Sequence, residues 1–209
     1  MVRTCTWALA LVTIALTAAS PAAAQSWLAV DDAGAIQIKS ALDAAPPETT
    51  VLASDLGGLT VGVITPGIAL ATRPTPIGDF AEIAWPESSI LGDVGTPAIP
   101  VVRKLFVIPD GAAMSLRVEL GAGVTIDAAT LGNALLPVQA PIEKLPGARE
   151  NAPFVINEAA YQANAELPVE RATVTELGIV REQRIGMLEL RPVSYNPATG
   201  AATIYPDLM

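Results

Sequence analysis

The chain has 209 residues, of which 51% are hydrophobic and 4% aromatic, so its core must be built mainly from aliphatic side chains. Acidic residues outnumber lysine and arginine by 21 to 12, and the resulting net charge of −9 argues against nucleic-acid binding. Histidine is absent and the single cysteine is Cys5, which excludes a Ser-His-Asp triad and, past residue 5, any Cys ligand or disulfide. We therefore predict no catalytic residues, no cofactor and no metal site.

Residues 1–24 have the three regions of a secretory signal peptide. Arg3 carries the positive charge, residues 7–16 are apolar, and three alanines ending at Ala24 form a small-residue cleavage site before Gln25. The apolar segment is shorter than the roughly 20 residues that span a bilayer. We predict cleavage between Ala24 and Gln25, and a mature chain that is periplasmic, cell-surface or extracellular and has no membrane partner.

The chain after the signal divides into a weakly patterned start and a strongly patterned remainder. Residues 31–55 mix Ala, Asp, Glu and Pro, so we expect 25–55 to be a loose N-terminal lead-in with one strand near 35–38. Two apolar runs, 59–64 and 68–71, flank Pro66-Gly67, a pair that is typical of a type II turn in a hairpin.

Short strands dominate the rest of the chain. Residues 114–120 alternate apolar and polar side chains, which predicts a strand with one buried face and an inward Leu116. Residues 101–108 are apolar on both faces, as expected of a more central strand. Only 158–165 has the pattern of a short helix. With 18 prolines and 16 glycines, the chain predicts an all-β fold, a β-sandwich of short antiparallel strands with Pro/Gly-rich connectors.

Two irregular segments interrupt these strands. Residues 136–153, with four prolines, form a long loop of the kind that is usually functional or disordered. Near the end, residues 196–200 (NPATG) predict a hairpin loop that pairs 184–191 with 201–205.

Several of these segments share a recurring pattern. A strand ends in an apolar-Pro pair, a Gly-x-Pro-x-apolar-Pro connector comes next, and the following strand closes on Ile-Pro before a small-residue turn. The connector residues are Gly95, Pro97 and Pro100, the strand closes at Pro109, and a second match contains Tyr195, Asn196 and Pro197. With this pattern, the C-terminal two thirds of the chain resembles the propeptides of gingipain-like cysteine peptidases, the C25 family with a caspase fold.

The resemblance implies a β-sandwich that covers a peptidase and sends a basic side chain from a loop into its specificity pocket. The candidates are Arg149 and Lys144 in the 136–153 loop, or Leu145 or Ile142 if the pocket is apolar. The residues alone also fit solvated loop charges. The connector at 95–100 either crosses between sheets or lies against the partner, and we expect the motif residues to be structural.

The leading hypothesis is a secreted, non-catalytic propeptide that assists folding of a gingipain-like endopeptidase and keeps it latent. The peptidase domain would follow Met209 in the same chain, or act as a partner in trans. A free-standing exported β-sandwich used for binding or adhesion is the alternative, since this architecture hosts many functions. An enzyme without His or Cys is the third, remote possibility.

Overall fold

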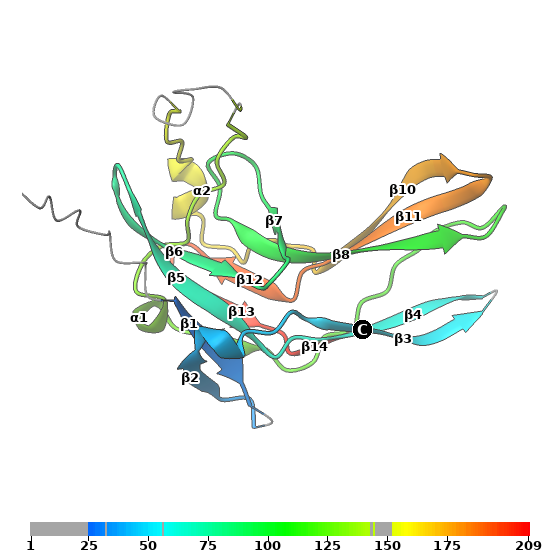
Figure 1. Cartoon of the computed structure of the whole chain (residues 1–209), viewed down its shortest axis with the longest axis horizontal. Coiled ribbons are helices and arrows are strands. Elements are labelled where there is room, and N and C mark those ends of the chain that lie inside the picture. The colour runs from blue at the N-terminus through cyan, green and yellow to red at the C-terminus, as the bar shows by residue number, and fades with distance from the viewer. Residues whose placement is uncertain (1–24, 32, 56, 143, 145–151) are drawn as a thin grey trace, which may run out of the picture.

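The structure is a computed structural model that describes residues 25–31, 33–55, 57–142, 144 and 152–209 (Figure 1). Strands dominate this part of the chain, with two short helices and one 3-10 turn. The bounds are β1 Gln25–Val30, β2 Ile36–Ser40, η1 Ala41–Asp43, β3 Glu48–Asp55, β4 Gly58–Ile64, β5 Gly67–Thr75, β6 Gly78–Ala84, β7 Ser89–Leu91, β8 Ile99–Ile108, β9 Val124–Ile126, α1 Ala128–Leu131, α2 Glu158–Gln162, β10 Ala172–Val180, β11 Gln183–Leu190, β12 Val193–Asn196, β13 Ala201–Ile204 and β14 Asp207–Leu208.

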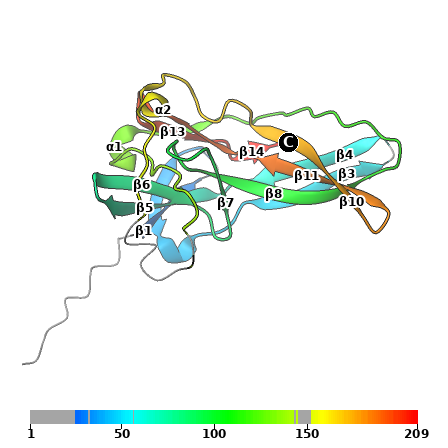
Figure 2. The same ribbon diagram turned by 90° about the horizontal axis from the view of Figure 1, so that it is seen from above.

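The strands form small sheets in which all neighbouring strands are antiparallel. Their orders are β2-β1-β5-β6, β10-β11-β8-β7, β12-β13-β9 and β14-β4-β3. In Figure 1 the β10-β11-β8 sheet lies above β3 and β4, and Figure 2 shows that the two overlap when seen from above. The predicted all-β sandwich is confirmed. No helix in the described residues is long and apolar enough to cross a membrane.

The main core lies at the end of the molecule where β1, β5, β6, β12 and β13 meet. Aliphatic side chains fill it, as the composition requires, together with Trp27, Trp85 and Tyr195. The Trp85 indole donates to the Gly67 carbonyl at 2.6 Å, so its polar atom is satisfied inside the core. Burying each large apolar side chain contributes about 1.5 to 3 kcal/mol. A second, smaller cluster lies between β4 and β11, where the two stacked sheets begin to separate.

The expected loose lead-in at 25–55 is wrong. β1 is a central strand that pairs with both β2 and β5, and it places Trp27 and Leu28 in the main core. The strand expected near 35–38 is β2 at Ile36–Ser40, and β3 comes after it. The acidic and proline residues of 31–55 belong to the turns and exposed faces of these strands, so this composition does not indicate a lack of regular structure.

The predicted hairpin at Pro66-Gly67 is also wrong. β4 and β5 belong to different sheets, so the chain changes sheet here instead of turning back. Gly67 has φ +157°, and a Cβ on it would lie 2.3 Å from the Leu28 carbonyl oxygen. The glycine therefore permits β1 to approach the backbone at the crossing point.

The 114–120 segment is not a regular strand. Only its end is paired: Leu120 bridges Leu208, and Glu119 exchanges backbone hydrogen bonds of 2.5 and 2.8 Å with Met209. Leu116 is 41% exposed. Apolar and polar members of the alternation alike, from Met114 to Glu119, line a cleft of about 1180 Å³ between β4 and β8. The predicted buried face with an inward Leu116 is therefore wrong, because the separation of the two sheets leaves residues 114–118 beside an open cleft.

The C-terminal hairpin is partly as predicted. The Gly200 N–H donates to the Asn196 carbonyl at 2.9 Å, and Gly200 takes the left-handed conformation at φ +67°. The strand that returns to β13 is β12, however, while β11 pairs with β10 and β8. The predicted pairing of 184–191 with 201–205 is therefore wrong. The short helix expected within 158–165 is confirmed as α2.

Candidate functional site

The motif connector at 95–100 holds the start of the 136–153 loop. Ala98 N–H donates to the Leu136 carbonyl, and Val138 N–H donates to the Thr96 carbonyl, each at 2.8 Å. Pro97 lies opposite Pro137 between these bonds, where neither residue has to donate. The connector thus acts as a short strand partner for the loop.

Gly95 fastens both ends of the loop. Its N–H donates to the Val138 carbonyl at 2.8 Å, and its own carbonyl accepts from Asn157 N–H at 2.9 Å. Gly95 has φ +89°, a left-handed conformation, and a Cβ there would lie 2.9 Å from the Asn157 nitrogen. We call residues 136–139 and 154–157 the loop stem, because one backbone unit ties these two segments together.

Gln139 closes the loop stem a second time. Its Nε2 donates to the Val155 carbonyl at 2.8 Å, and its Oε1 accepts from Val155 N–H at 2.9 Å. The side-chain amide therefore reproduces the pair of bonds that one strand residue makes with another. It joins positions 16 residues apart and restricts the exit directions of the intervening loop.

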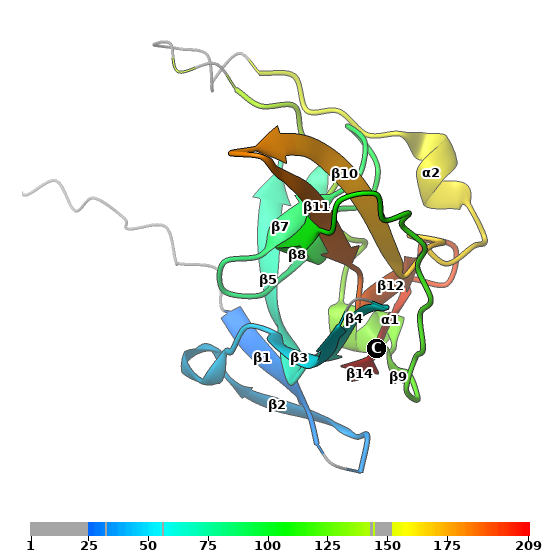
Figure 3. The ribbon, with the colours of Figure 1, turned by 90° about the vertical axis from the view of Figure 1, so that its right-hand side faces the viewer.

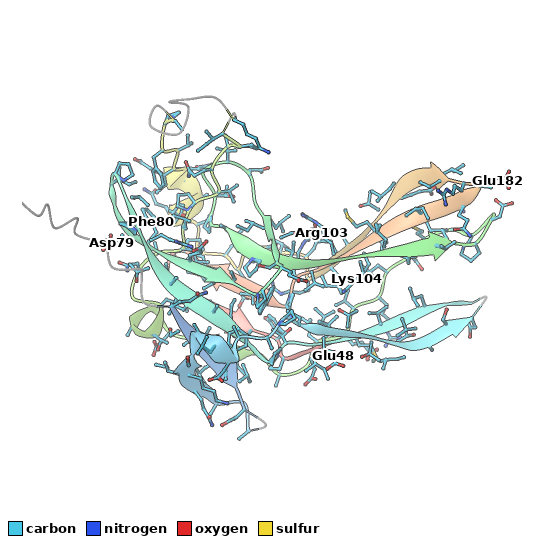
Figure 4. The ribbon with its side chains drawn as sticks, in the orientation of Figure 1. Glu48, Asp79, Phe80, Arg103, Lys104 and Glu182 are labelled. Carbon is cyan, nitrogen blue, oxygen red and sulfur yellow. The ribbon has the colours of Figure 1, made fainter. Side chains whose placement is uncertain are left out.

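An aromatic cluster supports the far side of the loop stem. Phe154 packs against Phe80 of β6 with ring centroids 5.8 Å apart, and Phe80 also meets Tyr161 of α2 edge-on at 6.4 Å. Burial raises the pKa of Tyr161, which keeps the phenol protonated while it donates to the Leu135 carbonyl. Figure 4 labels Phe80 beside α2, near the base of the loop stem.

Replacing Gln139 with alanine should release the loop stem without unfolding the sandwich. Val155 loses its acceptor, and the cross-link between 139 and 155 disappears. We expect the Val155 amide to exchange its hydrogen at least about tenfold faster, because an exposed hydrogen bond contributes about 0.5 to 1.5 kcal/mol and two are lost. Hydrogen exchange followed by NMR measures this. An unchanged rate at Val155 would show that the amide pair does not hold the loop stem.

Of the predicted inhibitory residues in the loop tip, only Lys144 is described, and its side chain is exposed. Arg149 and Leu145 lie outside the described residues, as does Ala24 of the predicted cleavage site. Gln25 is the first residue of β1. Ile142, which precedes the loop tip, is exposed. The described ends of the loop project beside α2, away from β3 and β4 (Figure 1).

The remaining motif residues lie at structural positions. Pro100 and Tyr195 are fully buried, and Tyr195 exchanges two 2.8 Å backbone hydrogen bonds with Leu167. The Pro109 carbonyl accepts from Ala112 N–H and from Arg184 Nη1. Asn196 and Pro197 form the β12-β13 turn.

Sequence reasoning missed a buried ionic cluster on the β10-β11-β8 sheet. Glu189 accepts from Arg191 at 2.6 Å and from Arg103 at 2.7 Å, while Arg191 also donates to the Glu170 carbonyl and the Thr173 hydroxyl. Burial raises the pKa of Glu189, but the hydrogen bonds and charges of the two guanidinium groups lower it by more, so the pKa lies below the ordinary 4.5. The alternation of β11 places Glu189 on one face, but no local signal indicates that two arginines meet there.

Comparisons with known proteins agree with this architecture. A sequence model of the C25 propeptides (Propeptide_C25) matches residues 41–209. Lys-gingipain of Porphyromonas gingivalis strain ATCC 33277 is 33% identical over 129 residues, which cover 62% of this chain. Lys-gingipain HG66 of the same species is 32% identical over an equal length. The chain spans about 8% of the length of these curated relatives.

Two solved structures share the fold. One, determined to explain the zymogenic latency of gingipain K from P. gingivalis, superposes with a TM-score of 0.70 at 28% identity, over 79% of this chain and 92% of that one. The other is the complex of the pro- and mature domains of P. gingivalis RgpB. It superposes with a TM-score of 0.66 at 20% identity, over 78% of this chain and 82% of that one. At that identity the second likeness concerns the fold alone.

Proposed function

Because this chain belongs to the C25 propeptide family, we propose that it keeps a gingipain-like cysteine peptidase latent by presenting the 140–153 loop to the active site. The observation that carries the proposal is the double closure of the loop stem, by Gly95 and by the Gln139–Val155 pair. A loop held at both ends enters a pocket with less loss of conformational entropy than a free one. The chain contributes no catalytic group and is exported with its partner.

Arg149 is the first candidate for the residue that enters the specificity pocket. Its planar guanidinium pairs in two parallel hydrogen bonds with a carboxylate at a pocket floor, which a lysine ammonium cannot do. Lys144 is the second candidate, and Leu145 or Ile142 takes the position if the pocket is apolar. The same surface would also support folding of the peptidase, because a partner that binds only the folded form stabilises it.

Purified residues 25–209 should inhibit the gingipain-like peptidase encoded in the same genome when added in trans. An interface of standard size, about 1,600 Å² in total, can reach nanomolar affinity or better. Arg149→Ala should weaken inhibition by about 2 to 5 kcal/mol, since a desolvated charge loses its partner. Its melting temperature should stay that of the parent. Steady-state inhibition assays and thermal denaturation measure both.

Lys144→Ala is the comparison variant, because it removes the second candidate cation from the same loop, and it should inhibit like the parent if Arg149 is the residue that enters the pocket. If both variants inhibit like the parent and deletion of 143–150 does no more, the loop is only a spacer. No inhibition by the parent at about 1 µM, well above the expected dissociation constant, would contradict the latency role itself.

A further inference from the structure

In the described part of the chain, one face of the β10-β11-β8 sheet, opposite β3 and β4, has no second sheet packed on it (Figure 1). Strand register places Arg103, Glu189 and Thr173 in one row, and Leu105, Met187 and Thr175 in the next. Val107 and Ile185 form the third row. Because side chains alternate along a strand, the neighbours Lys104 and Phe106 point the other way, toward the cleft above β4, although Leu105 and Val107 between them also belong to the cleft lining. Figure 4 shows Arg103 and Lys104 on opposite sides of β8.

This outer face carries exposed apolar side chains. Leu105 is 68% and Val107 53% exposed, while Met187 and Ile185 beside them are half-buried. We call these four residues the outer strip. The strip is contiguous across β8 and β11, since its members are directly paired. Contiguous exposed apolar surface on an otherwise acidic chain is the usual mark of an interaction site.

The outer strip lies on the same side of the molecule as the loop. Figure 4 places Arg103, at the border of the strip, above β8, and Figures 1 and 3 place α2 and the described ends of the loop above β8 as well, with β3 and β4 below it. One globular partner that receives the loop therefore also faces the strip. The cleft between β4 and β8 faces away from such a partner.

The area that a stable complex needs supports this placement. An inhibitory complex of standard size buries about 800 Å² on each partner, contributed by about 20 to 30 residues. The 15 residues between Gln139 and Val155 are fewer than this number, so the loop alone supplies only part of such a surface. The outer strip is apolar and uncovered, so it can supply the desolvated centre that gives an interface most of its affinity.

Charge at the edge of the strip indicates the chemistry of the partner surface. Arg103 is held by one bond from Nε to Glu189, and within the part of the chain that the structure describes neither of its Nη nitrogens has a partner. It is thus a preoriented cation on a chain of net charge −9. A carboxylate on the partner would pair with it.

From this arrangement we propose that the outer strip, bordered by Arg103, is the second contact surface for the peptidase domain, separate from the loop. This inference rests on the proposed function, because it takes the peptidase as the occupant. The partner surface is apolar and carries an acidic residue opposite Arg103. The strip supplies binding energy, whereas the loop supplies blockage of the active site.

Leu105→Asp tests this proposal directly, because it places a charge in the centre of the strip. The folded chain should tolerate the change, since Leu105 is exposed. The probe is the peptidase domain from the same genome with its catalytic cysteine replaced by alanine. Calorimetry should show a dissociation constant at least tenfold higher than that of the parent, and Val107→Asp should act in the same direction. Arg103→Gln should reduce the weakening of binding by added NaCl.

Two matched controls separate this surface from general effects of exposed aspartate. Ile38→Asp in β2, where the isoleucine is 70% exposed, and Val51→Asp in β3, where the valine is 59% exposed, should bind within twofold of the parent.

A result that does not depend on substitution comes from hydroxyl-radical footprinting of the parent. Binding should protect Leu105 and Met187, and should leave Met114 in the cleft unprotected.

The outcomes separate the two proposals. If Leu105→Asp binds like the parent, and binding leaves Leu105 and Met187 unprotected, the proposal that the outer strip binds the peptidase is wrong, even if the parent inhibits. Weaker binding by Val51→Asp alone places the interface in the cleft and also overturns it. If Leu105→Asp instead abolishes self-association of the chain in sedimentation, the occupant is a second copy and the inference is wrong. If the parent binds through Leu105 but does not inhibit, the latency proposal is wrong and the outer-strip proposal is supported. If the parent does not bind at all, both proposals are wrong.

Discussion

Glu189→Ala should lower the free energy of unfolding by about 3 to 5 kcal/mol at pH 7, the range for breaking a buried ion pair from one side. The variant leaves Arg191, which is buried, without the carboxylate that accepts from it at 2.6 Å. Arg191 keeps its bonds to the Glu170 carbonyl and the Thr173 hydroxyl, so we expect the lower end of the range. Urea denaturation of residues 25–209 measures the loss.

Glu176→Ala is the matched control for this prediction. Glu176 of β10 pairs with Arg184 of β11 in the same sheet, but its carboxylate lies at the surface, where solvent screens the pair. The control should lose far less stability than Glu189→Ala. Equal losses would show that burial of the Glu189 cluster is not what stabilises the sheet.

The contribution of Glu189 should also depend on pH with a defined sign. The unfolded carboxyl titrates near 4.5, and the folded pKa lies below that value because Arg191 and Arg103 favour the charged form. The stabilisation is therefore complete above pH 4.5 and is lost as the pH falls through the folded pKa. The difference in unfolding free energy between the parent and Glu189→Gln should stay constant from pH 7 down to about pH 5 and shrink below pH 4.5.

Gly95→Ala should disable inhibition more than it disables folding. The left-handed conformation at φ +89° costs a non-glycine residue about 1 to 3 kcal/mol. The added Cβ would also lie 2.9 Å from the Asn157 nitrogen and 3.2 Å from the Ile156 carbonyl carbon. Residues 154–157 of the loop stem must therefore move. We expect the inhibition constant to rise at least about tenfold, as small misplacements of a positioned group commonly cause.

Gly111→Ala separates strain from displacement. Gly111 also has positive φ, at +70°, but a Cβ there would meet nothing within 4 Å. This variant should lose about 1 kcal/mol or more of stability through backbone strain and still inhibit like the parent. If both glycine variants inhibit equally well, the position of the loop stem does not control inhibition.

The sequence alone was sufficient wherever a structure depends on neighbouring residues. The Asn196–Gly200 turn is dictated by local chemistry, because Asn accepts from the turn backbone and Gly200 accepts a positive φ without strain. The pattern of apolar side chains is enough to predict strand β8 and helix α2. The aliphatic core results from a composition with few aromatics. The family resemblance identified the connector at 95–100, although not its hold on the loop.

Tertiary structure decided which strands pair and what their faces meet. A period of two indicates which side chains share a face, but it does not indicate what that face packs against. Leu116 therefore lines an open cleft instead of a core, and β11 pairs with β8 instead of β13. Pro66-Gly67 fits a turn locally, yet close approach of β1 makes it a crossing between sheets. The Gln139–Val155 closure joins residues 16 apart, and the Arg103–Glu189 pair joins residues 86 apart. Such contacts form only after the sheets have brought these segments together.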